Sequence, residues 1–190
     1  MANIITAPES DWVEHVLDFW FGELQPARWF KSDDAIDDAV RARFTATHDT
    51  IAETFDVVAG MASPRRALAT VIVLDQFPRN IFRGTGRAFA TDPLARATAS
   101  DAVSRQLDSP LSMHERLFLY LPFEHSEALA DQHRAVDLIS SLGDAHFTRY
   151  AEAHRDIIAR FGRFPHRNAI LGRISTPEEL AFLQQPNSSF

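Results

Sequence analysis

Polar side chains that could bind anions or transfer protons gather in three segments of the sequence, residues 75–92, 121–127 and 160–179. The first and third share a pattern. Residues 77–80 are Phe-Pro-Arg-Asn, and residues 164–168 are Phe-Pro-His-Arg-Asn. A proline disfavours the helical conformation of the residue before it. We therefore expect each proline to end a helix and the side chains after it to project outward.

The residue types in these segments favour an anion site. An arginine guanidinium binds carboxylate or phosphate, often through two parallel hydrogen bonds, and histidine changes charge near neutral pH. The sequence thus predicts a site for a small anionic molecule. Its candidate residues are Arg79, Asn80, Arg83, Glu124, His125, Glu127, Arg163, His166, Arg167, Asn168 and Arg173.

The same residues have other interpretations. Glu124 and Glu127 are either counter-charges that fix the arginines or acid–base groups, and the whole set could be a salt-bridge network that holds the loops. If a reaction takes place, His125 or His166 beside a carboxylate is the natural proton carrier. The sequence alone leaves open whether the chain is an enzyme.

A metal-dependent enzyme is a further alternative. His125, His154 and His166, together with Glu124 or Glu127, offer nitrogen and oxygen donors. The chain has no cysteine, and no close ligand spacing such as His-Glu-x-x-His is present. We expect no metal and no cofactor.

Helical periodicity runs through almost the whole sequence, which predicts an all-α fold of about eight helices. Caps and glycines set the expected boundaries. The expected helices are 10–22, 32–60 (one long helix or two nearly continuous ones), 63–78, 92–107, 112–122, 126–142, 144–162 and a short one from 176.

Short connections make consecutive helices antiparallel neighbours, so loops sort to two ends of the fold. One end receives the plain turns, residues 59–63, 108–111 and 143–144. The other receives the longer loops, residues 22–31, 78–92, 122–126 and 162–175. We therefore predict that Arg79, His125 and His166 meet at one end, within about 15 Å of each other.

Four ordered runs carry a family resemblance: LDFWFGEL, LDQFPRNIFRGTGRAFATD, PFEHSE and FGRFPHRNAILGRISTPEE. In these runs the chain resembles the bacterial family known as domain of unknown function 924, from about residue 13 to 183. The resemblance implies antiparallel helical hairpins similar to tetratricopeptide-type repeats. The family has no established activity, so it implies none here.

An interaction module is the rival class of function. Residues 17–30 hold five aromatic side chains, more than one helix face buries. Trp29 and Phe30 fall in a loop assigned to the end with the candidate site, where they could line a pocket or contact a protein or peptide partner.

Composition and charge narrow the possible classes of protein. The 190 residues suit a single domain, residues 1–190, with 45% hydrophobic and 24% charged residues. A net charge of −7, concentrated in the first 60 residues, argues against nucleic-acid binding. The apolar runs are short and the first residues lack a signal-peptide pattern, so we expect a cytoplasmic protein with no membrane partner.

Overall fold

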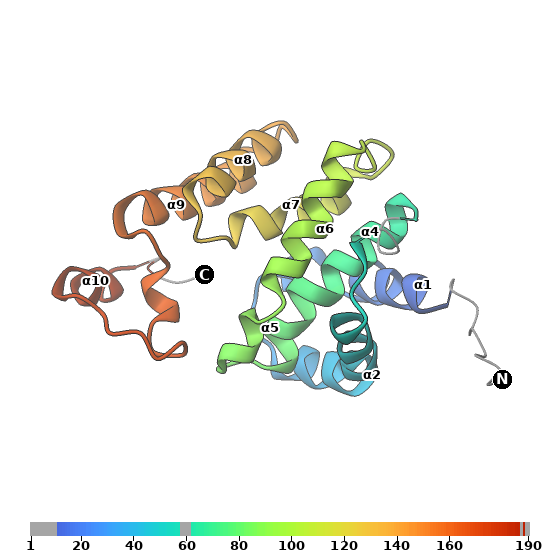
Figure 1. Cartoon of the computed structure of the whole chain (residues 1–190), viewed down its shortest axis with the longest axis horizontal. Helices are drawn as coiled ribbons and strands as arrows, with labels where there is room; N and C mark the ends of the chain where they lie inside the picture. The colour runs from blue at the N-terminus through green and yellow to red at the C-terminus, as the bar shows by residue number, and fades with distance from the viewer. Residues whose placement is uncertain (1–10, 58–61, 187, 189–190) are drawn as a thin grey trace.

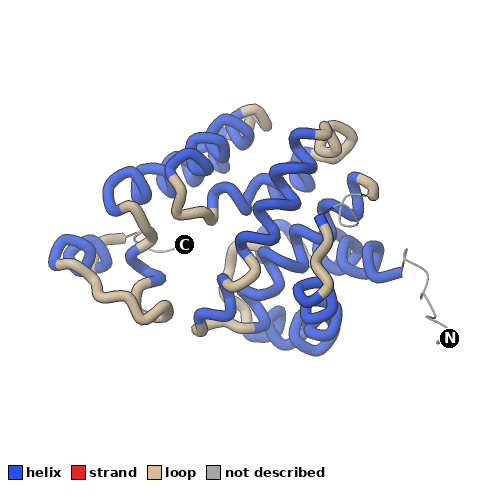
Figure 2. The backbone as a smooth tube through the Cα atoms, viewed as in Figure 1, coloured by secondary structure: helices blue, strands red, loops and turns tan. Residues whose placement is uncertain are grey.

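The computed structural model describes residues 11–57, 62–186 and 188, and within them the chain is helical without β-strands (Figure 2). Two π-helical segments, Asp18–Glu23 and Ile72–Gln76, extend α1 and join α4 to α5. With α4 to α5 taken as one, the described residues form eight α-helical runs and three short 3-10 helices, so the predicted all-α class is confirmed. The helices (Figure 1) are α1 (Asp11–Leu17), α2 (Asp34–Glu53), α4 (Pro64–Val71), α5 (Phe77–Ile81), α6 (Asp92–Ser104), α7 (Met113–Glu124), α8 (Leu129–Ser140), α9 (Ala145–Phe161) and α10 (Pro177–Leu183).

The helices pack mainly as neighbouring pairs. α8 lies against α7 and α9, α2 against α5, and α4 against α6. α10 belongs to the C-terminal stretch, residues 162–186, at the left of Figure 1. Large apolar side chains such as Trp20, Phe77 and Phe118 fill the main core. A smaller cluster around Ile158 and Phe164 holds the C-terminal stretch. In the described part of the chain, no helix is long and apolar enough to span a membrane.

The predicted helix caps are largely confirmed. Ser112 and Glu115 form a reciprocal capping box at the start of α7, and Thr176 and Glu179 form one at the start of α10. Gly162 ends α9 with a φ of 68°, a left-handed conformation that glycine adopts at little cost. The expected boundaries at residues 10 and 60 lie outside the described residues.

The predicted helix stops at Pro78 and Pro122 were wrong, and Pro165 does not end α9, which stops at Phe161 with Gly162 as its cap. The helical run that begins at α4 passes through Pro78 to Ile81, and α7 passes through Pro122 to Glu124. A proline cannot donate a backbone hydrogen bond, so the carbonyl of Leu74 loses its usual partner at residue 78. The Thr91 hydroxyl donates to that carbonyl at 2.6 Å, so the run continues through Pro78.

Other expected boundaries shift by a few residues. Asp33, not Ser32, caps α2, because its carboxylate accepts hydrogen bonds from the amides of Ala35 and Ile36. α2 ends at Glu53, so residues 32–60 are not one continuous helix, and α8 begins at Leu129 rather than residue 126.

The placement of the 22–31 loop was also wrong. Trp29 packs against His114 at the start of α7, with ring centroids 5.2 Å apart, whereas His125 follows the other end of that helix. Twelve residues of α-helix span about 18 Å. The aromatic loop and the polar segments therefore lie at opposite ends of α7.

Candidate functional site

Asp75 is the centre of a buried polar cluster. It is fully buried in the π-helical segment between α4 and α5, and both of its carboxylate oxygens lie within hydrogen-bonding distance of His125 Nδ1, at 2.9 and 3.0 Å. Gln76 Nε2 donates to Asp75 Oδ2 at 2.5 Å. Burial alone would raise the pKa of Asp75, but the charge of Arg79 and the interaction with His125 bring it down to about 2. Asp75 is therefore an ionised, dehydrated carboxylate.

His125 follows the last residue of α7 and is oriented by this carboxylate. A carboxylate at Nδ1 favours the tautomer that carries its hydrogen there, so Nε2 is left with its lone pair. Burial and the neighbouring Arg79 lower the pKa of His125 below its usual value. Asp75 acts to raise this pKa, but the lowering effects are larger. The imidazole is neutral at pH 7 and can accept a proton at Nε2.

Arg79 links this pair to α6. Its guanidinium donates to the Asp75 backbone carbonyl and lies 3.4 Å from Asp75 Oδ1. It also forms two hydrogen bonds with Asp92 at the start of α6, at 2.9 and 3.0 Å. The charge of Arg79 is therefore matched by two carboxylates.

Arg167 approaches the cluster from the C-terminal stretch, in the turn Pro165–Arg167. Its guanidinium lies between two phenylalanine rings, 4.6 Å from the centroid of Phe89 and 4.4 Å from that of Phe164. NH1 donates to the His125 carbonyl at 3.0 Å, but the nearest Asp92 oxygen is 3.8 Å away. The buried Nε has no hydrogen-bond partner. Burial first and Arg79 second lower the pKa of Arg167 to about 10, so it is still a cation at pH 7.

Glu124 has the opposite state to Asp75. Burial and the repulsion of Asp75 raise its pKa to about 8, so this carboxyl group carries a proton at neutral pH. Oε1 lies 3.3 Å from His154 Nδ1, which also donates to the Tyr150 carbonyl at 2.8 Å. Burial lowers the pKa of His154 to about 3, so His154 is neutral. Two adjacent buried carboxyl groups are thus held in different protonation states.

His166 borders the cluster. It is partly exposed, and its ring packs against Phe164 with centroids 5.5 Å apart. Burial first and Arg167 second lower its pKa to about 4, and His125 contributes to the same shift. The structure therefore brings together five of the predicted site residues, Arg79, Glu124, His125, His166 and Arg167.

Two further predicted residues, Glu127 and Arg173, form an ion pair next to this cluster. Arg173 donates two hydrogen bonds to Glu127, at 2.6 and 2.9 Å, and a third to the Phe164 carbonyl. Glu127 also accepts from the Phe164 amide at 2.8 Å. This pair fixes the C-terminal stretch against the residues that follow α7.

The remaining four predicted residues lie in two separate ion-pair groups. Asn80 and Arg83 both donate to the buried Asp37, which ties α5 to α2. Arg163 forms two hydrogen bonds with Glu179, at 2.6 and 2.8 Å. Asn168 donates to Ser175 and to the same Glu179. For these four residues the salt-bridge interpretation describes the geometry.

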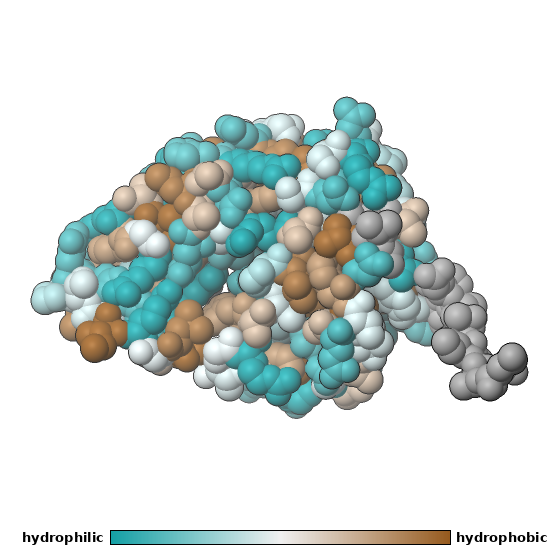
Figure 3. Space-filling model, viewed as in Figure 1, coloured by the Kyte–Doolittle hydropathy of each residue, from teal (hydrophilic) through white to brown (hydrophobic). Residues whose placement is uncertain are grey.

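The molecule is hollowed beside this cluster. In the space-filling view the surface recedes between the C-terminal stretch and the start of α6, and hydrophilic residues line much of the hollow (Figure 3). The cluster links the same segments, because Arg167 of the C-terminal stretch reaches His125 after α7 and approaches Asp92 of α6. His125 keeps 15% of its side chain exposed.

A family model described as "Bacterial protein of unknown function (DUF924)" matches residues 16–187. The chain belongs to this family. It is also similar to the solved structure of the protein of unknown function ATU0120 from Agrobacterium tumefaciens. The two are 44% identical, with a TM-score of 0.85, and the match covers 90% of this chain and 96% of that chain. No curated protein matches the chain. The resemblance in the four sequence runs is confirmed, and it brings no activity with it.

In this DUF924 chain, sequence reasoning missed the carboxylates that organise the site. Asp75 and Asp92 stand at the two ends of the first polar segment, whereas the site residues predicted in that segment, Arg79, Asn80 and Arg83, lie between them. An acid within the apolar run before Phe77 was the available signal, because a buried charge needs a partner.

The structure of this chain does not provide a set of metal ligands for the alternative of a metal-dependent enzyme, as far as its described residues go. Within the described residues, no three histidine or acidic side chains are placed so that they could hold one ion. His125 and His154 instead direct Nδ1 to Asp75 and to the Tyr150 carbonyl, respectively.

Proposed function

We propose that this protein binds a small anionic molecule, a carboxylate or a phosphate, beside Arg167 and His125. The observation that supports this most is the environment of Arg167. Of the five candidate arginines, the other four have hydrogen-bonded carboxylates, namely Asp92, Asp37, Glu179 and Glu127. Arg167 has only a carbonyl and a carboxylate beyond hydrogen-bonding distance.

The energetics of burial favour this proposal. A buried guanidinium that lacks a carboxylate partner keeps much of its desolvation cost, and part of that cost shows in its lowered pKa. A bound carboxylate or phosphate would supply the missing hydrogen bonds, and charge-assisted hydrogen bonds are the stronger kind. The two phenylalanine rings hold the guanidinium plane in position before the anion arrives.

His125 would couple anion binding to proton uptake. The charges of Asp75, Arg79, Asp92 and Arg167 already balance, so an incoming anion adds a negative charge that protonation of Nε2 offsets. Asp75 at Nδ1 stabilises the resulting imidazolium. If the bound molecule reacts, His125 is the group able to carry a proton to or from it.

The test compares sulfate with sodium chloride at equal ionic strength in a thermal unfolding assay of the whole chain. A ligand at 100 times its Kd stabilises a protein by about 2.7 kcal/mol, so we expect saturating sulfate to raise Tm by about 5 °C or more. Arg167→Ala should lose this increase. Arg167→Met keeps an unbranched apolar chain between the two rings and should lose it as well.

Arg160→Ala is the matched control, because Arg160 lies in the last turn of α9, just before that stretch, and pairs with the exposed Glu178. It should keep the sulfate effect. If both Arg167 variants lose several kcal/mol of stability without sulfate, and the wild type gains nothing from sulfate, the cluster is a structural network.

An interaction module is the second candidate function. Exposed aliphatic side chains gather on the C-terminal stretch, with Ile174 91% and Leu180 54% exposed. Ile170 and Leu171 add to this surface. A tetratricopeptide-like groove for a peptide would use such residues. The absence of any anion effect in the unfolding assay would favour this candidate.

A further inference from the structure

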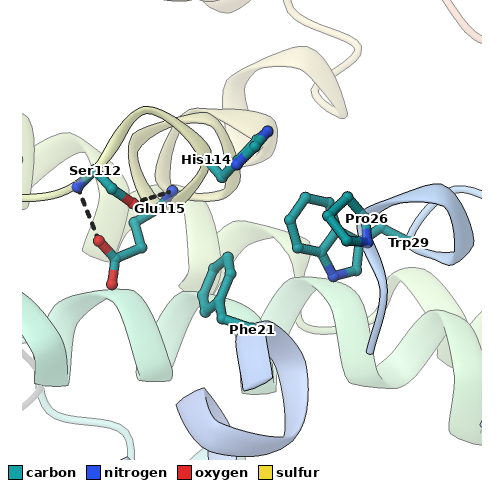
Figure 4. A pocket seen from close by; sticks show the side chains of 6 residues that line it. All are labelled: Phe21, Pro26, Trp29, Ser112, His114 and Glu115. Atoms are coloured by element: carbon teal, nitrogen blue, oxygen red, sulfur yellow. Dashed lines mark hydrogen bonds between the residues drawn. The ribbon is translucent and has the colours of Figure 1, made fainter. Parts of the chain in front are cut away.

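A second hollow lies at the other end of α7 from His125. Its volume is about 270 Å³, and it is lined by Phe21, Pro26, Trp29, Ser112, His114 and Glu115. Figure 4 shows Phe21, Pro26 and Trp29 beside the first turn of α7, which carries His114 and Glu115. Two aromatic residues of segment 17–30, Phe21 and Trp29, which the proposed function does not use, form part of this wall.

The rings of the hollow stand roughly at right angles to one another. Trp29 lies 5.7 Å from Phe21 at an interplanar angle of 76°, and 5.2 Å from His114 at 68°. Phe118 packs behind both Trp29 and Phe21. Trp29 is 9% exposed and its Nε1 donates to the Trp20 carbonyl at 2.9 Å, so its ring is fixed. Three aromatic rings thus line the hollow, and the face of an aromatic ring carries partial negative charge.

The formal charge at the hollow is also negative. Glu115 accepts a hydrogen bond from the Ser112 amide through Oε2, while Oε1 is 4.0 Å from Arg65. Arg65 is engaged by Glu14 through two hydrogen bonds. The positive end of a helix dipole amounts to about half a charge, less than the full charge of Glu115 in the first turn.

We infer that this hollow binds a small organic cation, such as a quaternary ammonium group. A cation within about 6 Å of a ring centroid is attracted to the ring face, and tryptophan is the strongest such partner. Glu115 adds a charge that an uncharged molecule of the same shape would not use. The volume of the hollow lies just below the range of pockets that bind drug-sized molecules, so it suits a cation of a few heavy atoms.

The test is calorimetric titration of the whole chain with tetramethylammonium chloride and with tert-butanol, an uncharged probe of similar size. We expect the wild type to bind the cation and not the alcohol. Glu115→Gln should weaken cation binding about fivefold or more, since charges about 4 Å apart near a protein surface interact by several RT. Glutamine can replace glutamate in a capping box, so this variant should fold.

His114→Ala removes one ring and should weaken the cation about threefold, within the range of an exposed cation–π contact. Glu178→Gln removes an exposed acid on α10 and should change nothing. Absence of cation binding, equal binding of the alcohol, or unchanged affinity in Glu115→Gln would overturn the inference. None of these outcomes bears on the anion site, because all three variants leave Arg167 and His125 intact.

Discussion

At the scale of single residues, the buried cluster sets two carboxyl groups to opposite states. Arg79 and His125 keep Asp75 ionised with a pKa of about 2, whereas Glu124 has no hydrogen-bonded cation and stays protonated up to about pH 8. Unfolded, Glu124 loses its proton near 4.5. The folded state therefore binds more protons between these pH values, and Glu124 makes stability fall as pH rises through this window.

Glu124→Gln removes this dependence, because an amide of similar shape has no proton to lose. We expect the stability of the variant relative to wild type to increase from pH 5 to pH 8, by at most about 1.4 kcal/mol per pH unit. Urea unfolding at four pH values measures it. Glu178→Gln, at an exposed position, should show a flat difference over the same range. A flat difference for Glu124→Gln would mean that Glu124 is ionised in the folded protein.

At the scale of elements, Thr91 is the residue that lets a helix pass Pro78. Its buried hydroxyl donates a hydrogen bond to the Leu74 carbonyl, which cannot accept one from the backbone nitrogen of Pro78. Thr91→Val keeps the shape and leaves that carbonyl unsatisfied, so we expect a loss of about 1–3 kcal/mol in urea unfolding. Thr85→Val removes an exposed hydroxyl that bonds the Phe82 carbonyl, and should cost less than about 0.5 kcal/mol. Equal effects of the two substitutions would contradict this role.

The same contact shows how far the sequence predicts the elements. Caps such as Ser112 and Thr176 were predictable, because a capping box is formed by residues three positions apart. The continuation of the helix through Pro78 was not, because it depends on Thr91, a residue 13 positions further along the chain. Local sequence signals a break there, and a tertiary contact overrides it.

The candidate site was likewise predictable from the sequence only in part. The residues that follow Phe-Pro in the first and third polar segments include Arg79 and Arg167, and both guanidinium groups approach Asp92 in the structure. Which arginine lacks a carboxylate was not predictable, since Asp37 and Glu179 reach their partners from distant helices. Charge pairing across the fold, and not residue type, separates Arg167 from the structural arginines.

At the scale of the whole molecule, the C-terminal stretch closes one side of the candidate anion site. The ion pair between Glu127 and Arg173 holds this stretch in place. Arg167 extends from the stretch and donates a hydrogen bond to the carbonyl of His125. A bound anion would lie where the stretch meets the helices that carry His125 and Asp92. Anion binding and protonation of His125 should therefore favour each other.

The most direct measurement is calorimetric titration of chelator-treated protein with sulfate and with a dicarboxylate at pH 7.5 and pH 5.5, with zinc as the comparison. Sulfate keeps its charge over this range. We predict that it binds more tightly at pH 5.5, by at most about tenfold per pH unit for one linked proton. A metal needs neutral imidazole, so zinc affinity would fall in acid. Tight zinc binding that weakens at pH 5.5, with no anion binding at either pH, would contradict the proposed function.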